Sequence, residues 1–318
     1  MSPEDCTPLP QAPSSFPRYC GRFAPAPTGS LHFGSLVAAL ASCLDARAAN
    51  GEWLLRIEDV ETSRIVPKAA DQIIRTLEAF GFEWDRAVLF QSDRLDRYHA
   101  ALVHLQLEGD AFPCSCDMRA VLPSHHTLSI DGECIYPGTC RRGMAEGEAA
   151  RVWRLRVPDR EFSFIDRIQG ALTQNLEKEL GDFALFRTDG QFSYHLAVVI
   201  DDAEQKVNHV VRGADLLNST VRQIWLQQCL GLPPMRYAHI PVVVNATGQK
   251  ISKRTFAASL DPAKGNALLV EAMRFLGHTV PDDLIKAPVR EFWPWAINAW
   301  SIDLVPRAQG IFTGYDLN

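Results

Sequence analysis

Two short segments, far apart in the chain, combine residue types that bind phosphate groups. The first, residues 22–35, places small and rigid residues between an expected strand and an expected helix, with His32 at the helix start. Such a turn lets the backbone approach a ligand closely, and the helix start offers unpaired N–H groups to phosphate. The spacing differs from the dinucleotide fingerprint and from the P-loop. The plain alternative is a proline-rich connection whose histidine packs against the sheet.

The second segment, residues 248–254, contains Lys250 and Lys253 in a glycine-flanked loop. Two ammonium groups at this spacing could reach a triphosphate. By itself, however, a K-x-S-K string is more common in solvated basic loops. The segment therefore gains weight only in combination with the first one.

A third group of residues indicates a metal site. Four cysteines fall within 27 residues: Cys114, Cys116, Cys134 and Cys140. Clustered cysteines in a chain of this length bind metal more often than they form disulfides, and structural zinc takes four ligands. Chemistry alone favours Cys134 as the fourth ligand, and reduced buried thiols without a metal are the alternative. We expect His125 and His126 to be surface residues.

The elements that must position these groups begin with a βαβ pattern. It consists of a strand at residues 19–23, a helix at 34–49 and a buried strand at 53–57. Pro67 suits the first position of a helix that ends at Gly81. A further strand at 88–91 and a further helix at 95–107 are expected.

After an irregular cysteine region, the middle of the chain alternates apolar and polar residues, which predicts antiparallel strands. These strands are expected at 151–157, 162–168, 183–186 and 191–194, the last two joined by the hairpin signal Thr188-Asp189-Gly190. A strand at 207–211, a helix at 216–230 and a strand at 240–244 follow.

The simplest architecture is an α/β fold with one parallel sheet whose halves are separated by an insertion. The expected parts are a leader at 1–18, two halves of a nucleotide-binding catalytic domain at 19–106 and 182–245, an inserted domain at 107–181, and a loop with a short, mostly helical region at 246–318.

The composition limits the class of protein. With 318 residues and 47% apolar content, the chain can form one large domain with insertions or two modest ones. Its net charge of -6 argues against a protein that coats nucleic acid without specificity, although a local basic face is compatible with it. No apolar run has the ~18 residues that span a bilayer. The proline-rich residues 1–18 do not resemble a secretory signal. We therefore expect a disordered leader, a cytoplasmic protein and a monomer.

In this order, the two phosphate-binding segments resemble the HIGH and KMSKS signatures of class I aminoacyl-tRNA synthetases. The resemblance covers residues 19–260 and is closest to the glutamyl branch, in four segments: 22–34, 56–59, 194–202 and 211–215. Ser35 replaces the second histidine of HIGH. Ile251 and Arg254 also depart from KMSKS but leave both lysines in place.

This resemblance implies that a substrate carboxylate attacks the α-phosphate of ATP, so the protein must neutralise charge on the phosphates. His32, Lys250 and Lys253 are the expected catalytic residues, and His32, Gly34 and Lys253 the expected ATP-binding residues. Mg²⁺ would share the pyrophosphate charge. The chemistry requires no nucleophilic side chain.

Glutamate recognition would need cations for two carboxylates and an anion for the ammonium group. Arg22 and Arg212 can supply guanidinium groups, Glu58 can face the ammonium, and Tyr194 can add a hydrogen bond. The other expected glutamate-binding residues are Phe23, Ala24, Pro25 and Ala26. Alternatively, Glu58 and Arg22 form a structural ion pair, and Tyr194 belongs to the core.

Asp201 and Asp202 look like a metal-binding pair. We interpret them instead as the end of a strand or loop that faces solvent or RNA, without a metal.

Size and the cysteine pattern narrow the resemblance. Only residues 255–318 follow the KMSKS-like loop, too few for the anticodon-binding domains of a standard glutamyl-tRNA synthetase. The chain resembles the truncated glutamyl-queuosine tRNA(Asp) synthetases, which activate L-glutamate without tRNA and attach it to queuosine at the wobble position of tRNA(Asp). In that family the zinc pattern implies Cys114, Cys116, Tyr136 and Cys140 as ligands.

Two rival hypotheses remain. One is the core of a conventional glutamyl- or glutaminyl-tRNA synthetase that charges a terminal adenosine. The other is a non-catalytic tRNA-binding or regulatory protein.

Overall fold

The computed structural model of this chain describes residues 18–116, 128–129, 134–245, 247–250 and 259–312. The leader at 1–17 and the lysine loop at 251–258 lie outside the described residues, as do His125 and His126. In the described ranges, no helix combines the length and the apolar character needed to cross a membrane.

The first half of the main sheet is parallel. Strands β1 (Cys20–Phe23), β2 (Glu52–Ile57) and β3 (Leu89–Phe90) lie in the order β1-β2-β3. Helix α1 (Phe33–Ala48) connects β1 to β2, and residues 39–46 of it are buried on every side. The predicted βαβ unit is therefore present.

Helix α2 (Ala69–Ala79) starts later than Pro67, where the sequence pattern placed its first residue. Lys68 has a positive φ of 66°, so the chain turns there before the helix begins.

The second half of the main sheet lies beside β1. Strands β9 (His209–Gly213) and β10 (Arg236–Ile240) are parallel neighbours, flanked by helices α6 (Tyr194–Glu204) and α7 (Ser219–Cys229). The backbone N–H of Asn208 donates to the Cys20 carbonyl at 3.0 Å, which joins the two halves at β1 and β9. The strand order reverses at this point, where open α/β sheets bind ligands beyond the carboxyl ends of their strands.

The segment between the two halves folds into antiparallel structure. It follows helix α3 (Leu95–Leu107), and its strands β4 (Ala111–Cys114) and β5 (Val152–Leu155) form one sheet with β8 (Phe183–Phe186). The expected boundary at residue 181 therefore does not separate the sheets, because β8 pairs with β5.

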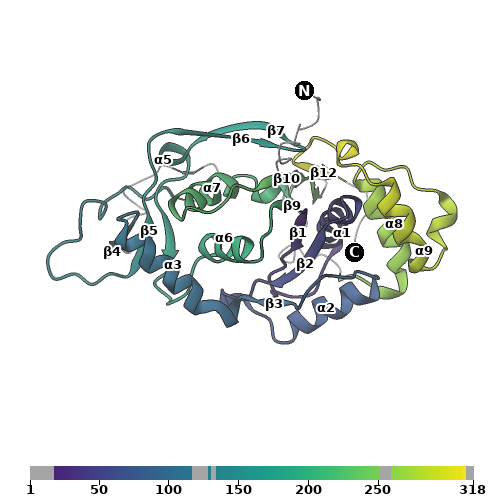
Figure 1. Cartoon of the computed structure of the whole chain (residues 1–318), viewed down its shortest axis with the longest axis horizontal. Coiled ribbons are helices and arrows are strands. Elements are labelled where there is room, and N and C mark those ends of the chain that lie inside the picture. The colour runs from purple at the N-terminus through teal and green to yellow at the C-terminus, as the bar shows by residue number, and fades with distance from the viewer. Residues whose placement is uncertain (1–17, 117–127, 130–133, 246, 251–258, 313–318) are drawn as a thin grey trace, which may run out of the picture.

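A hairpin ties this segment back to the main sheet. Strands β6 (Glu161–Asp166) and β7 (Gly170–Asn175) form the hairpin, which leads into the short helix α5 (Leu176–Glu179). Its end reaches β10, where Asp166 is the register partner of Tyr237. In Figure 1 the hairpin extends from the lobe that contains β4 and β5 to the centre of the molecule.

Two strand predictions need correction. Residues 191–194 form no hairpin strand, since only the isolated bridge between Phe186 and Phe192 remains. Instead, Ser193 caps α6, and its hydroxyl accepts from the Leu196 N–H. A strong turn signal at 188–190 thus precedes a helix cap that the alternating pattern concealed.

The predicted strand at 240–244 spans two elements. β10 ends at Ile240, and β11 (Val242–Val244) pairs in parallel with β12 (Gly310–Phe312) near the end of the described chain.

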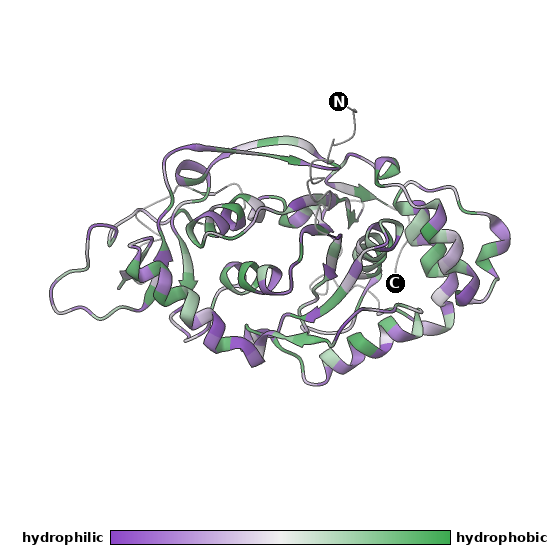
Figure 2. Cartoon of the chain, in the orientation of Figure 1, coloured by the Kyte–Doolittle hydropathy of each residue, from purple (hydrophilic) through white to green (hydrophobic). Residues whose placement is uncertain are grey.

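The C-terminal helices belong to the core of the first sheet half. Helices α8 (Gly265–Phe275) and α9 (Val289–Ala299) pack with α1, β1 and β2 in one apolar cluster that includes Trp53, Phe80 and Phe292. A second cluster is built from α3, β8, α6 and α7. Figure 2 shows apolar residues along the inner faces of these helices. Within the described ranges, short 3-10 turns also lie at Thr62–Arg64, Gln91–Arg94, Ala214–Leu216, Pro262–Lys264, Asp282–Ile285 and Ile302–Leu304.

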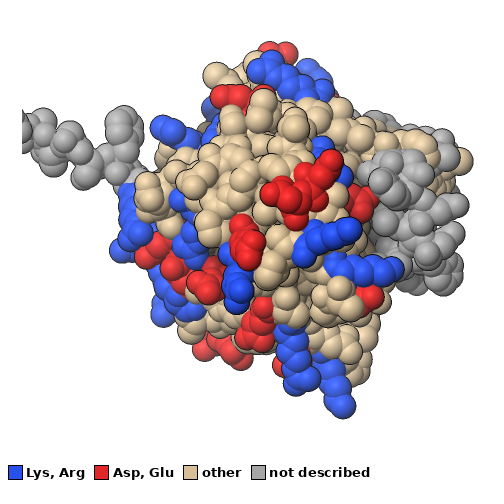
Figure 3. All heavy atoms as spheres, turned by 90° about the vertical axis from the view of Figure 1, so that its right-hand side faces the viewer, with Lys and Arg blue, Asp and Glu red and all other residues tan. Residues whose placement is uncertain are grey.

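Charged side chains of both signs share the face at the C-terminal helices. In Figure 3, basic and acidic groups alternate over the described part of this face. A single-sign field that would bind any polyanion is therefore absent from that visible, described part, in line with the net charge of -6.

Candidate active site

A cavity of about 790 Å³ opens beyond the carboxyl ends of β1, β2 and β9. It is lined by these predicted residues: Arg22, Phe23, Ala24, Pro25, Ala26, His32, Gly34, Glu58, Tyr194, Arg212 and Lys250. The structure thus brings the predicted glutamate-binding residues, His32 and one loop lysine to the same cavity. Lys253 lies outside the described residues.

His32 forms the start of α1. Its backbone is extended, and its Nδ1 accepts a hydrogen bond from the Ser35 N–H at 3.3 Å. This contact fixes the imidazole ring beside Gly34, whose missing side chain leaves that space open: a Cβ there would lie 3.2 Å from the His32 ring. The first turn of α1 is therefore shaped around the histidine, at the helix end that favours anions.

Arg22 is held by an aspartate from helix α6. Its Nε donates to Asp202 Oδ1 at 3.1 Å, and both side chains are almost fully buried. Asp202 also pairs with Arg56 at 2.8 Å. Burial opposes ionisation of Asp202, but these two guanidinium groups outweigh it and lower the pKa of the carboxyl.

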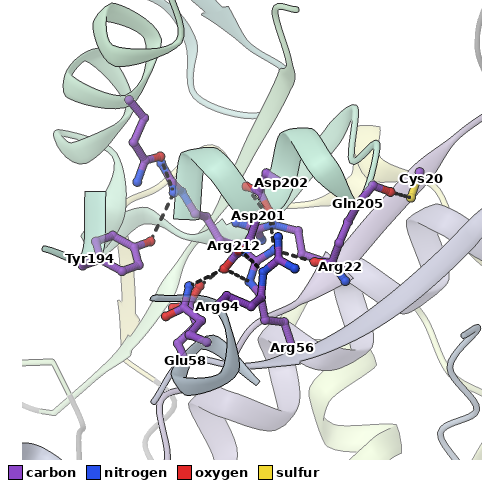
Figure 4. A network of polar contacts seen from close by, with 12 residues as sticks. Cys20, Arg22, Arg56, Glu58, Arg94, Tyr194, Asp201, Asp202, Gln205 and Arg212 are labelled. Atoms are coloured by element: carbon purple, nitrogen blue, oxygen red, sulfur yellow. Dashed lines mark hydrogen bonds and ion pairs between the residues drawn. The ribbon is translucent and has the colours of Figure 1, made fainter. Parts of the chain in front are cut away.

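This arrangement corrects the interpretation of Asp201 and Asp202. Both lie within α6 and are buried, rather than at a strand or loop end that faces solvent or RNA. Asp201 accepts from Arg94 at 2.6 Å, from Tyr98 at 2.8 Å and from Gln91 at 2.9 Å. Figure 4 shows the two carboxylates surrounded by Arg22, Arg56 and Arg94. Both carboxylates can be buried on the inner side of α6 because Arg22, Arg56 and Arg94 balance their charges there.

Sequence reasoning assigned no role to Arg56 or Arg94. A buried arginine needs carboxylate partners. The partners of Arg56 and Arg94 lie on α6, far along the chain, so local sequence patterns did not indicate them.

Glu58 lies at the end of β2. Its Oε1 accepts from Arg56 Nη2 at 3.3 Å, and burial raises the pKa of its carboxyl. The alternative of a Glu58–Arg22 ion pair is not what the structure shows, since Glu58 pairs with Arg56 and Arg22 pairs with Asp202. Glu58 still faces the cavity, where it can meet a positively charged ligand group.

Arg212 differs from Arg22 and Arg56 because its partners are neutral. Nε donates to His239 Nε2 at 3.0 Å, and Nη1 donates to Gln223 at 2.8 Å and to the Tyr194 hydroxyl at 3.5 Å. Nη2 donates to the Thr220 hydroxyl at 2.9 Å and to a backbone carbonyl. Among the described residues, no carboxylate forms an ion pair with it. A cation of 5% exposure that faces a cavity without a counter-ion favours an anionic ligand.

Lys250 lines the same cavity. Its Nζ pairs with Asp215, another lining residue, and its backbone bridges to Val244 at the end of β11. The start of the lysine loop is thus anchored beside the histidine turn.

The cysteine cluster lies at the far end of the inserted segment. The sulfurs of Cys114, Cys116 and Cys140 lie within 4.8 Å of one another. The Tyr136 hydroxyl lies 3.4 Å from Cys114 Sγ and 3.7 Å from Cys116 Sγ, and it accepts from the Cys140 N–H at 2.7 Å. Cys134 is outside this group, among the residues that the structure describes.

Hydrogen bonds favour the thiolate form of Cys140, whereas burial raises the pKa of Cys116 and of Tyr136. Burial opposes ionisation of Cys140, but hydrogen bonds from Ser115 outweigh it and lower the pKa of the thiol to about 6. Three thiols and a phenol form a donor set that fits a soft, tetrahedral metal ion.

Comparison with known proteins agrees with this geometry. Residues 20–277 match the family model of the catalytic domain of class I tRNA synthetases (E and Q). The chain is 55% identical over 289 residues to a glutamyl-Q tRNA(Asp) synthetase from Dechloromonas aromatica, covering 91% of this chain and 96% of the relative. A protein of the same name from Burkholderia mallei is 52% identical, with 92% and 99% covered.

A solved structure has the same fold. The glutamate tRNA ligase from Elizabethkingia meningosepticum, in complex with its amino acid, superposes with a TM-score of 0.78 at 25% identity. The superposition covers 95% of this chain and 68% of that one. The chain therefore belongs to the class I tRNA synthetases of the glutamyl and glutaminyl type, in the family of the glutamyl-Q tRNA(Asp) synthetases.

Proposed function

We propose that this protein activates L-glutamate with ATP, forming glutamyl-adenylate without tRNA, and transfers the glutamyl group to queuosine in tRNA(Asp). The observation that carries the first step is the buried, uncompensated guanidinium of Arg212 at the reversal point of the sheet. The names of the relatives support the acceptor.

Glutamate carries two carboxylates and one ammonium group, and the cavity offers a matching set. Arg212 and Arg22 face it as cations, and Glu58 faces it as the anion. Arg22 keeps both terminal nitrogens without a hydrogen-bond partner among the described residues, because Asp202 engages only Nε. Arg22 can therefore bind one carboxylate through these nitrogens. Arg212 can bind the other where a ligand oxygen replaces one of its neutral acceptors, of which the Tyr194 hydroxyl at 3.5 Å is the most distant.

ATP would occupy the part of the cavity between the histidine turn and the lysine loop. The first turn of α1 and His32 can donate to phosphate oxygens, and Lys250 and Lys253 can neutralise them. Mg²⁺ bound with ATP would supply further neutralisation of the pyrophosphate. The attacking group is the carboxylate of glutamate, so the protein positions and neutralises rather than reacting covalently.

Zinc fits the cluster of Cys114, Cys116, Tyr136 and Cys140. A zinc ion bound there would supply folding energy rather than catalysis, because four protein ligands leave no open position.

Pyrophosphate exchange into ATP tests the activation step. The wild-type protein should exchange pyrophosphate only when glutamate is present, without any tRNA. Complete absence of exchange would contradict the proposal.

Comparison of tRNA(Asp) with and without queuosine tests the acceptor, and equal labelling of both would contradict the second step.

Lys253→Ala should reduce this exchange by ~100-fold or more, since it removes a cation from the phosphates. Zinc content should stay unchanged. Lys264→Ala, at an exposed lysine beyond the loop, is the matched control and should keep wild-type activity. Retained exchange in the Lys253 variant would show that the ATP site lies elsewhere.

A further inference from the structure

Arg212 is connected to a buried carboxylate through a histidine. His239 Nε2 accepts from Arg212 Nε at 3.0 Å, and His239 Nδ1 lies 2.6 Å from Asp166 Oδ2. All three side chains are buried, with exposed fractions of 2% for Asp166, 0% for His239 and 5% for Arg212. The three residues come from different strands, β6, β10 and β9.

The hydrogen bonds determine the tautomer of His239. A guanidinium group always donates, so the Nε2 atom that faces Arg212 Nε must carry the lone pair. The proton of a neutral ring is then on Nδ1, where it donates to the Asp166 carboxylate. Burial lowers the pKa of His239 to about 4, which agrees with a neutral ring.

Asp166 is itself fixed by the backbone. Its Oδ1 accepts from the N–H groups of Ile168 at 3.0 Å, Gln169 at 2.9 Å and His239 at 3.1 Å. The carboxylate can therefore orient the imidazole without moving toward Arg212.

The intervening ring also preserves the charge of Arg212. A carboxylate in direct contact would orient the guanidinium but would also compensate its charge, as Asp202 does for Arg22. With a neutral imidazole between them, Arg212 is held at Nε while its charge stays uncompensated, which favours an anionic ligand.

We propose that Asp166 and His239 are positioning residues that hold Arg212 in place for a carboxylate of glutamate. This inference rests on the proposed function and adds that the inserted segment, through the end of β6, contributes to the amino-acid site.

Asp166→Asn tests the arrangement with a minimal change in shape. The Asn oxygen can keep the backbone hydrogen bonds, so its NH₂ group would face His239 Nδ1 and force the proton onto Nε2. The N–H groups of His239 Nε2 and Arg212 Nε would then face each other, and the hydrogen bond between them would be lost. The KM for glutamate should rise ~10–100-fold, as when other orienting partners are lost. The KM for ATP and kcat at saturating glutamate should stay near wild type.

A spectroscopic readout accompanies the kinetics. Imidazole ¹⁵N spectra of the wild-type protein should show a protonated Nδ1 and an unprotonated Nε2 for His239, and the two should exchange roles in the variant. Asp182→Asn is the matched control, since it makes the same change at a buried carboxylate that accepts from the Val157 N–H and pairs with Arg141, and it should leave both KM values unchanged.

The outcomes separate the two proposals. A wild-type protein without glutamate-dependent exchange would contradict the proposed function. An active wild-type protein whose Asp166→Asn variant keeps its KM for glutamate would overturn the positioning role alone. If the variant fails to fold, protonation of Nε2 in the wild-type spectrum would overturn it, and protonation of Nδ1 would support it.

Discussion

At the scale of single residues, three buried arginines of the site differ in whether a carboxylate balances their charge. Arg22 and Arg56 are compensated by Asp202, whereas Arg212 has only neutral partners among the described residues. The compensated pair stabilises the contact between the two sheet halves. The uncompensated cation is costly to bury, and a ligand carboxylate offsets that cost.

Asp202→Asn should destabilise the protein strongly, because Arg22 and Arg56 would lose a buried counter-charge. Breaking a buried pair on one side typically costs about 3–5 kcal/mol. The KM for glutamate should also rise, since Arg22 would lose its orientation. Urea denaturation and exchange kinetics measure the two effects.

The control is Asp159→Asn, which removes an ion pair with Lys178 whose two side chains are 51% and 68% exposed. This variant should have nearly the wild-type denaturation midpoint, because solvent screens such pairs. Equal midpoint shifts in both variants would contradict the role given to the buried network.

At the scale of elements, the inserted segment has two distinct contacts. Its sheet of β4, β5 and β8 carries the cysteine cluster, and its hairpin of β6 and β7 reaches β10 and delivers Asp166. The cysteine cluster itself packs with Phe112 and Val152 in a small apolar group of its own. Substitutions in this cluster should therefore affect the inserted segment first.

Cys140→Ser should lose zinc, because serine cannot supply the thiolate that this site favours. Cys134→Ser is the matched control and should keep zinc, since Cys134 lies outside the cluster. Metal analysis of the purified variants measures both. If the Cys134 variant loses zinc and the Cys140 variant keeps it, Cys134 is the zinc ligand and Cys140 is not.

At the scale of the whole molecule, the two sheet halves and the C-terminal helices are bound into one structure by buried contacts. β1 pairs with β2 on one side and joins β9 on the other, while α8 and α9 complete the core around α1. Burial in this single structure keeps some ionisable groups neutral or ion-paired only in the folded state. The free energy of unfolding of the whole molecule should therefore depend on pH.

Stability should fall in mildly acidic solution because burial lowers the pKa of several histidines, His195 and His209 among them. His239 is one of these histidines. Its folded pKa of about 4 lies below the ordinary value of 6.5, so the unfolded chain binds a proton first as the pH falls. The stabilisation is fully present above about pH 6.5 and is lost between pH 6.5 and 4. Within that window this residue contributes about 1.4 kcal/mol per pH unit.

Denaturation at several pH values measures this slope. His239→Gln should show a shallower dependence than the wild-type protein, and His99→Gln, at an exposed position, should show the wild-type slope. An unchanged slope in the His239 variant would mean that other groups cause the acid sensitivity.

The sequence by itself predicted which residues gather at one cavity and where the strands that present them end. Arg22, Glu58 and Arg212 follow apolar runs, and carboxyl ends of parallel strands share one edge, so a common site could be predicted from local patterns. Only the tertiary structure decided which carboxylates meet which arginines. Asp166 and His239 are 73 residues apart, and Arg22 and Asp202 are 180 apart. Periodicity reports only whether a side chain faces inward, whereas the partner of a buried charge is set by the packing of distant strands against one helix.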